Sequence, residues 1–168
     1  LRITGGEPLV RKDFMELMAR FSRHLGAGLN ELTLTTNGTL LSKYAGDLSA
    51  IGVRRINVSL DTLKRDLFEK IARRDSLGDV LKGIDAAIAA GLKVKINTVA
   101  LANINEHEIP DLIRFAHDRG ADITLIETMP MGEAETDRVE DFLSLNKVRA
   151  DLSKQFTLTD LDYTTGGP

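Results

Sequence analysis

Ile56-Asn57-Val58-Ser59-Leu60-Asp61 is the stretch that decides the fold, because apolar and polar residues alternate along it without a break. A period of two predicts a β-strand with one wholly apolar face and one polar face. The same split recurs in four other predicted strands, and in the last of them Ile126 opposes Leu125, Glu127 and Met129. We therefore predict a sheet with one face packed under helices and the other face polar. The predicted strands cover residues 1–4, 32–38, 55–60, 93–101 and 123–129.

Segments with apolar residues at helical spacing separate these strands, so strand and helix alternate along the chain. Alternation with short connections implies right-handed βαβ units and a parallel sheet of the α/β class. A barrel and an open sheet with helices on both sides would each satisfy this order. Because parallel sheets seldom leave one face bare, the polar face favours a partial TIM-type (β/α) barrel whose lumen holds a polar ligand. The helical patterns cover residues 14–25, 41–51, 65–71, 80–90, 109–116 and 145–156.

Length and composition limit the possible functions. The chain has 168 residues, 42% of them hydrophobic, a net charge of −3 and no cysteine. One ordinary globular domain fits these values, and the absence of a long basic run argues against nucleic-acid binding. No apolar run approaches the ~20 residues of a membrane helix. Disulfides and thiolate metal ligands are excluded from this chain. Because Leu1 already lies in a strand-like run, we expect the chain to be an internal piece of a longer protein.

The segment Ile3-Thr4-Gly5-Gly6-Glu7-Pro8 joins the first predicted strand to the first helix. Two glycines allow a tight turn and let the backbone approach a ligand closely. Pro8 ends strand pairing, and Glu7 places a negative charge just past the carboxyl end of a strand, where α/β proteins usually have their active sites. An ordinary strand-to-helix turn would use the same residue types, so this segment alone decides nothing.

Two cations are predicted to lie on the polar face of the sheet. Arg2 and Lys95 both alternate with apolar residues that face the helices. Burying their charges without partners is costly, so an anionic ligand or an acid such as Glu127 is expected to compensate them. Phosphate is the natural candidate for such a ligand.

Three short motifs resemble the radical S-adenosylmethionine (SAM) enzymes when they are taken in order on successive strand ends. They are Gly5-Gly6-Glu7-Pro8, Thr36-Asn37-Gly38 and Val58-Ser59-Leu60-Asp61. Longer strings are similar to the family of radical enzymes that cyclise GTP in molybdenum cofactor biosynthesis, and the likeness covers essentially the whole chain. These strings are residues 2–11, 52–61, 93–97 and 126–133.

The resemblance implies that residues 1–168 are the central part of one radical SAM barrel domain, without the N-terminal cluster segment and the C-terminal cluster region. In this family an iron–sulfur cluster cleaves SAM to a 5′-deoxyadenosyl radical, which converts GTP to 3′,8-cyclo-7,8-dihydro-GTP. Two 4Fe–4S clusters belong to the full-length protein, and their ligands lie outside this chain, which is therefore expected to be inactive alone. The resemblance also implies a cytoplasmic enzyme with GTP as its partner. We expect no nucleic-acid or membrane partner, and the resemblance is compatible with a homo-oligomer.

The family's binding residues carry over to matching positions of this sequence. The resemblance implies that Gly5, Gly6, Glu7, Ser59, Asn97 and Met129 bind the SAM cofactor. It implies that Arg2, Thr35 and Lys95 bind GTP. No residue is assigned as catalytic or as a metal ligand, and packing of the lumen is the other interpretation for each of these residues, above all for Thr35 and Met129. Many relatives carry an arginine where this chain has Thr124, and Arg138 in the following loop is a candidate to replace it.

Three other functions stay open at this point. In a Schiff-base aldolase barrel, Lys95 would attack a carbonyl, although that hypothesis gives no reason for the glycine pair and Glu7. A different radical SAM enzyme would modify a peptide or another small molecule, but a neutral peptide would not need Arg2 together with Lys95. A non-catalytic binding domain has no positive feature in its favour.

Overall fold

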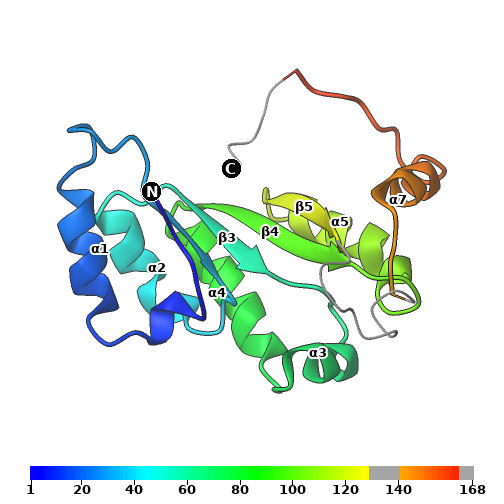
Figure 1. Ribbon diagram of the computed structural model, residues 1–168, viewed down its shortest axis with the longest axis horizontal. Helices are drawn as coiled ribbons and strands as arrows, with labels where there is room; N and C mark the ends of the chain where they lie inside the picture. The colour runs from blue at the N-terminus through cyan, green and yellow to red at the C-terminus, as the bar shows by residue number, and fades with distance from the viewer. Residues whose placement is uncertain (129–140, 163–168) are drawn as a thin grey trace, which may run out of the picture.

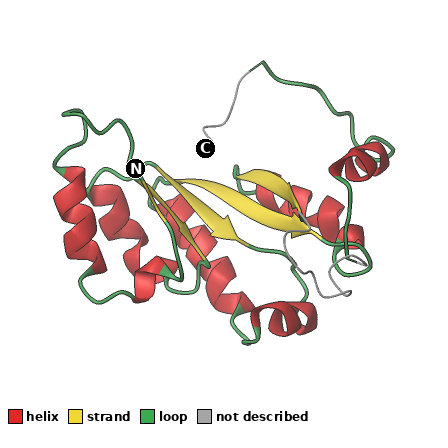
Figure 2. Ribbon diagram, viewed as in Figure 1, coloured by secondary structure: helices red, strands yellow, loops and turns green. Residues whose placement is uncertain are grey.

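A computed structural model describes residues 1–128 and 141–162 of the chain. It contains one five-stranded sheet in the order β1-β2-β3-β4-β5, in which all neighbouring strands are parallel (Figure 2). The prediction of a parallel sheet of five strands is confirmed, the strands lie in the sheet in their order along the chain, and the α/β fold is that of a partial TIM-type barrel. The strands are β1 (Arg2–Ile3), β2 (Thr33–Thr36), β3 (Arg55–Ser59), β4 (Lys93–Ala100) and β5 (Asp122–Glu127).

Helices connect the strands and follow the same order, from α1 on the left of Figure 1 through α2 and α4 to α5 and α7 on the right. Among the described residues, no helix is both long and apolar enough to cross a membrane. The α-helices are α1 (Phe14–Ser22), α2 (Leu41–Ala50), α3 (Arg65–Ala72), α4 (Leu77–Ala89), α5 (Ile109–His117) and α7 (Leu145–Leu152). Two short 3₁₀ helices are η1 (Pro8–Val10) and η2 (Glu106–Glu108).

The main hydrophobic core lies between the sheet and these helices. Leu34, Ile56 and Ile96 from three adjacent strands are fully buried in it, together with Leu48 of α2 and Ile84 of α4. Side chains alternate between the two faces of a strand, so the neighbours of these residues in sequence lie on the opposite face. We call that opposite side the polar face, since it carries Arg2, Thr35, Asn57, Ser59 and Lys95. The predicted split into an apolar and a polar face is confirmed for β2 to β4. In β1, Ile3 packs against the core as predicted, but Leu1 before it is half exposed.

The face assignment predicted for β5 is wrong. Val99 is the partner of Ile126, and the fully buried Ala100 is the partner of Glu127. Residues paired across parallel strands point to the same side of the sheet, so Ile126, which is 40% exposed, lies on the polar face. Glu127 lies on the helix side, where its Oε2 accepts a hydrogen bond of 2.8 Å from the backbone N–H of Leu145 at the start of α7.

A helix N-terminus explains this inversion, because its free N–H groups stabilise a carboxylate on a side that would otherwise be apolar. Glu127 therefore cannot be the acid that compensates the cations of the polar face, as the sequence had suggested. Leu125, on the same side of β5, packs against a second hydrophobic cluster that includes Leu143 and Val148.

Close packing fixes the turn that follows β2. Gly38 has a φ of +80°, which favours glycine, and α4 passes directly over it. A Cβ added to Gly83 of α4 would overlap the Gly38 carbonyl oxygen and would lie 3.1 Å from Cβ of Leu41. Glycine at position 83 therefore lets α4 approach the carboxyl end of β2, which borders the candidate site.

Candidate functional site

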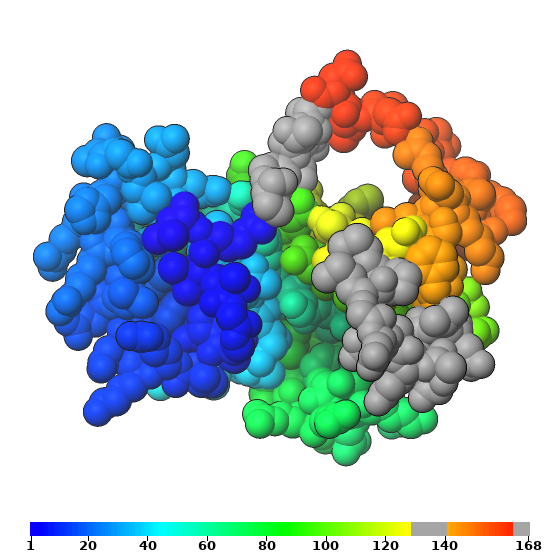
Figure 3. All heavy atoms as spheres, viewed as in Figure 1, coloured from blue at the N-terminus to red at the C-terminus, as the bar shows by residue number. Residues whose placement is uncertain are grey.

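The turn after β1 exposes its backbone at the carboxyl edge of the sheet. Gly5 has a φ of +131°, a conformation that side chains rarely adopt, and both Gly5 and Gly6 are exposed. A Cβ added at either glycine would meet nothing within 4 Å, so the main chain is open to a ligand there. In the space-filling view, the N-terminal segment (dark blue) lies on the surface of the molecule (Figure 3).

The Glu7 carboxylate fastens this turn to the next strand. Its Oε1 accepts hydrogen bonds from the Leu9 N–H (3.0 Å) and the Thr36 hydroxyl (2.7 Å). Its Oε2 accepts a hydrogen bond from the Asn37 N–H (2.6 Å). A carboxylate offers about four lone-pair sites, so most of the accepting capacity of Glu7 is used within the protein. The described contacts give Glu7 the part of holding the Gly5-Gly6 backbone against the end of β2.

A cavity of about 250 Å³ opens beside this turn. It brings together four of the predicted cofactor residues with Thr35, one of the predicted GTP residues. Its lining is Thr4, Gly5, Gly6, Glu7, Thr35, Thr36, Asn37 and Ser59. Residues from three different strand ends therefore border one hollow, as a ligand site at the carboxyl edge of a parallel sheet requires.

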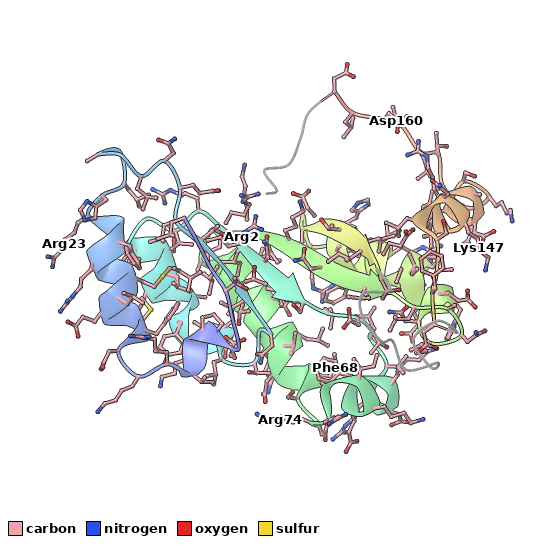
Figure 4. All side chains as sticks on the ribbon, viewed as in Figure 1. Arg2, Arg23, Phe68, Arg74, Lys147 and Asp160 are labelled. Atoms are coloured by element: carbon pink, nitrogen blue, oxygen red, sulfur yellow. The ribbon has the colours of Figure 1, made fainter. Side chains whose placement is uncertain are left out.

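A second cavity of about 260 Å³ shares Asn37 and Ser59 with the first and extends to Phe68 of α3 and to Arg74 just after that helix, both labelled in Figure 4. Asp61 lines it, and burial raises the pKa of this carboxyl, while a hydrogen bond from the Val99 N–H (2.8 Å) partly opposes the rise. Asp61 is not among the predicted site residues, although it ends the stretch Ile56–Asp61 that decided the fold.

The loop that carries Asp61 is held by a side chain from the loop that follows β4. The Asn105 side chain is fully buried, and its Nδ2 donates to the carbonyl oxygens of Asp61 (2.7 Å) and Val99 (2.8 Å). Its Oδ1 accepts from the Leu101 N–H (2.9 Å). One amide thus ties together the loops after β3 and β4, which fixes the Ser59–Asp61 segment where it borders both cavities.

Two rows of polar side chains cross the polar face, and each contributes one residue to the lining of the first cavity. Thr35, Asn57, Lys95 and Asp122 are partners in register across four strands, and we call them the first polar row. Ser59, Asn97 and Thr124 are partners one step nearer the carboxyl edge, and we call them the second polar row. The register thus brings two predicted GTP residues into the first row and two predicted cofactor residues into the second. Thr124, where many relatives were expected to carry arginine, also lies on this face.

Two buried polar atoms on this face have no hydrogen-bond partner among the described residues. They are Nε of Arg2 and Oδ1 of Asn57, a residue that is 4% exposed. Figure 4 labels Arg2 beside the strands of the sheet. Buried polar groups are normally paired, so each of these atoms indicates a missing ligand or solvent partner. Asn57 was not among the predicted site residues, because its position between Thr35 and Lys95 depends on the strand register.

Met129 and Arg138 lie outside the described residues, so their predicted roles stay predictions. In the described parts of the chain, no group of three or more histidine, cysteine, aspartate or glutamate side chains is placed to hold a metal ion.

Comparisons with known proteins find relatives of this chain in sequence and in fold. The model of the radical SAM superfamily matches residues 1–116. The GTP 3′,8-cyclase of Rhizobium etli is 61% identical over 168 residues, and that of Brucella canis is 62% identical over 169 residues. Both alignments include 100% of this chain but only 48% and 49% of the relatives. The chain therefore spans about half the length of the curated relatives it matches.

A solved structure shows the same fold at low sequence identity. SuiB of Streptococcus suis, bound to S-adenosylmethionine, superimposes with a TM-score of 0.65 at 20% identity. The match covers 92% of this chain and 34% of that chain.

Proposed function

The chain belongs to the radical SAM superfamily, and from that premise we propose that it is the central part of a GTP 3′,8-cyclase of molybdenum cofactor biosynthesis. The observation that carries the proposal is the arrangement of one face: an open glycine turn and its cavity lie beside two polar rows that include Lys95. Identity of 61% and 62% to two curated cyclases over the whole chain supports the choice of GTP among the substrates of the superfamily.

The cavity beside the glycine turn fits the aminoacyl end of SAM. Gly5 and Gly6 leave the space above their backbone free, so the main chain can hydrogen-bond a ligand's amino and carboxylate groups. Ser59 borders the cavity, and Asn97 is its partner in the second polar row. We assign these residues, and Met129, to the cofactor, with Glu7 holding the turn in place. When bound, SAM supplies the carbon-centred radical that starts the reaction.

The cations of the polar face fit the triphosphate of GTP. Lys95 lies in the first polar row and Arg2 on the same face of β1, where its Nε is buried without a partner among the described residues. Charge-assisted hydrogen bonds from such groups to phosphate are roughly twice as strong as neutral ones. Thr35 would add a hydroxyl, and Arg138 is our candidate for the arginine expected at Thr124. The ribose would then lie next to the second row, toward the cofactor.

The complete enzyme needs parts that this sequence does not contain. The chain has no cysteine, so we propose that other parts of the full-length protein hold the two 4Fe–4S clusters by thiolates. The chain alone is expected to be inactive. A cytoplasmic location and a homo-oligomeric assembly also remain proposals.

The family match weakens the aldolase hypothesis, because it gives the Gly5-Gly6-Glu7 turn a purpose that a Schiff base on Lys95 leaves unexplained. A radical SAM enzyme that modifies a peptide is the stronger alternative. Arg2 and Lys95 on one face favour an anionic substrate over a neutral peptide.

The test uses the full-length protein, reconstituted with iron and sulfide under anaerobic conditions and supplied with SAM, a reductant and either GTP or ATP. We expect GTP to be converted to 3′,8-cyclo-7,8-dihydro-GTP, identified by mass spectrometry, with one 5′-deoxyadenosine formed for each product molecule. ATP should give no cyclised product. Cleavage of SAM without any conversion of GTP would contradict the proposed substrate and would favour a sibling radical enzyme.

A further inference from the structure

We propose that Asn57 is a substrate-binding residue whose side-chain amide hydrogen-bonds a ribose hydroxyl of the bound nucleotide. The inference rests on the proposed function, because it takes GTP as the substrate of the polar face. It adds a residue to which neither the sequence motifs nor the resemblance gave a role.

Burial and a missing partner single out Asn57. The residue lies in the middle of β3 between Ile56 and Val58, both of which are fully buried on the helix side. Asn57 points to the opposite, polar face, yet it is only 4% exposed, and its Oδ1 has no hydrogen-bond partner among the described residues. A buried polar atom left unpaired is costly, so an amide of this kind is expected to be paired in the working protein.

The strand register places this amide inside the predicted substrate site. Thr35 on β2 and Lys95 on β4 are its two partners in the first polar row. Neighbouring strands are about 4.8 Å apart, so a ligand that contacts both of these residues must pass directly over Asn57. Ser59 and Asn97 of the second polar row lie one step away, on the side of the cofactor cavity.

The chemistry of the amide oxygen selects the part of the nucleotide that it can bind. Oδ1 only accepts hydrogen bonds, and ionised phosphate oxygens also only accept, so the triphosphate matches the ammonium of Lys95 and not this oxygen. A ribose hydroxyl is the donor nearest to the phosphate chain in a nucleotide, whereas the N–H groups of guanine lie farther away. Since Asn57 is one strand spacing from Lys95, the ribose is the better match.

This contact would orient the sugar whose hydrogen atom is to be removed. With the phosphates at Lys95 and a hydroxyl at Asn57, the ribose has little freedom to rotate beside the second polar row. Fixing a reacting group in this way contributes to rate through orientation, so Asn57 acts as a positioning residue as well as a binding residue.

The test is anaerobic calorimetric titration of the full-length protein with GTP, 2′-deoxy-GTP, 3′-deoxy-GTP and ITP. Asn57→Leu keeps the branched shape of the side chain but has no polar atoms, and it should weaken GTP binding about 5- to 30-fold, as expected for one lost hydrogen bond in a buried site. Wild-type protein should bind one of the two deoxynucleotides less tightly than GTP, whereas Asn57→Leu should bind that deoxynucleotide and GTP about equally. This loss of discrimination is the coupling expected for two groups in contact.

Asn30→Leu is the matched control, since Asn30 is exposed in the connection between α1 and β2, and it should bind all four nucleotides as wild type does. Unchanged SAM affinity in Asn57→Leu would show that the variant is folded. If that variant does not fold, Asn57→Ser provides the same comparison with a smaller polar side chain that is too short to make the contact.

The outcomes separate the inference from the proposed function. Wild-type protein that binds no GTP would overturn both. Wild-type protein that binds GTP, with the folded Asn57 variant binding it equally tightly, would overturn the inference alone. The inference would also be overturned if Asn57→Leu removed the difference in affinity between GTP and ITP but kept the difference between GTP and the deoxynucleotides. Asn57 would then contact the 2-amino group of guanine, which ITP lacks, and not a ribose hydroxyl.

Discussion

Glu7→Gln should loosen the connection between the glycine turn and β2. The glutamine carbonyl oxygen can keep the two contacts of Oε1, with Leu9 and Thr36, but its amino group would face the Asn37 N–H, which now donates to Oε2 at 2.6 Å. One charge-assisted hydrogen bond is thus replaced by two opposed donors. Such a bond contributes about 1.5–3 kcal/mol, so the free energy of local opening at Asn37 should fall by about that amount.

Hydrogen–deuterium exchange of the full-length protein, followed by mass spectrometry of peptides that contain Asn37, measures this loss. Because about 1.4 kcal/mol corresponds to a factor of ten, exchange at this amide should become roughly 10- to 150-fold faster. Glu16→Gln is the control, since its ion pair with Arg20 has side chains that are 61% and 69% exposed. An exposed pair of this kind contributes little, so exchange in α1 should change by no more than about threefold.

Unchanged exchange at Asn37 in a folded Glu7→Gln protein would refute the reasoning, because it would mean that the carboxylate does not hold the turn. Glu7 would then be available for its predicted role as a direct ligand of the cofactor, because its carboxylate would not be needed to hold the turn.

Asp61→Asn should stabilise the full-length protein at neutral pH. Burial raises the pKa of Asp61 in the fold, so the stability that this carboxyl contributes is present below its unfolded pKa and is lost as the pH rises through the folded pKa. The gain in stability from the asparagine is measured as the difference in thermal midpoint between the variant and wild type at several pH values. This difference should shrink as the pH falls toward about 4. A difference that is constant with pH would contradict this account. Gly83→Ala should destabilise by about 1–3 kcal/mol, despite a gain in helix propensity of about 1 kcal/mol, because the added Cβ overlaps the Gly38 carbonyl oxygen. Gly46→Ala, exposed in α2 with nothing within 4 Å of its added Cβ, should instead stabilise by up to about 1 kcal/mol, and equal effects of the two changes in thermal unfolding would count against the packing argument.

Periodicity predicted the order of the elements because strand and helix spacings differ and because β2, β3 and β4 each bury one face in the core. It predicted the ends of helices less well. Leu25 and Phe156 continue the apolar spacing of their helices, but α1 ends at Ser22 and α7 at Leu152. Both residues still pack against a hydrophobic cluster from the turn that follows the helix. A hydrophobic pattern records burial, and it does not record whether the backbone is still helical.

The features of the site that sequence reasoning missed depend on contacts between distant segments. The face of Glu127 was assigned from alternation alone, whereas the N–H of Leu145 at the start of α7 determines what it does. Asn57 looked like any polar residue of a strand until the register set it between Thr35 and Lys95. The bracing amide of Asn105 had no sequence signal, because its partners are backbone carbonyls, which every residue has.

The central claim, that the polar face binds the triphosphate of GTP, is tested most directly by titrating GTP and SAM separately into full-length wild-type, Lys95→Ala and Lys82→Ala proteins under anaerobic conditions. Lys95 is partly buried in the first polar row, whereas Lys82 is exposed on α4 in the helix layer. A charge-assisted contact of about 1.5–3 kcal/mol predicts that Lys95→Ala weakens GTP binding about 10- to 150-fold and leaves SAM binding nearly unchanged. Lys82→Ala should bind both ligands as wild type does. A folded Lys95→Ala protein that binds GTP as tightly as wild type would contradict the account.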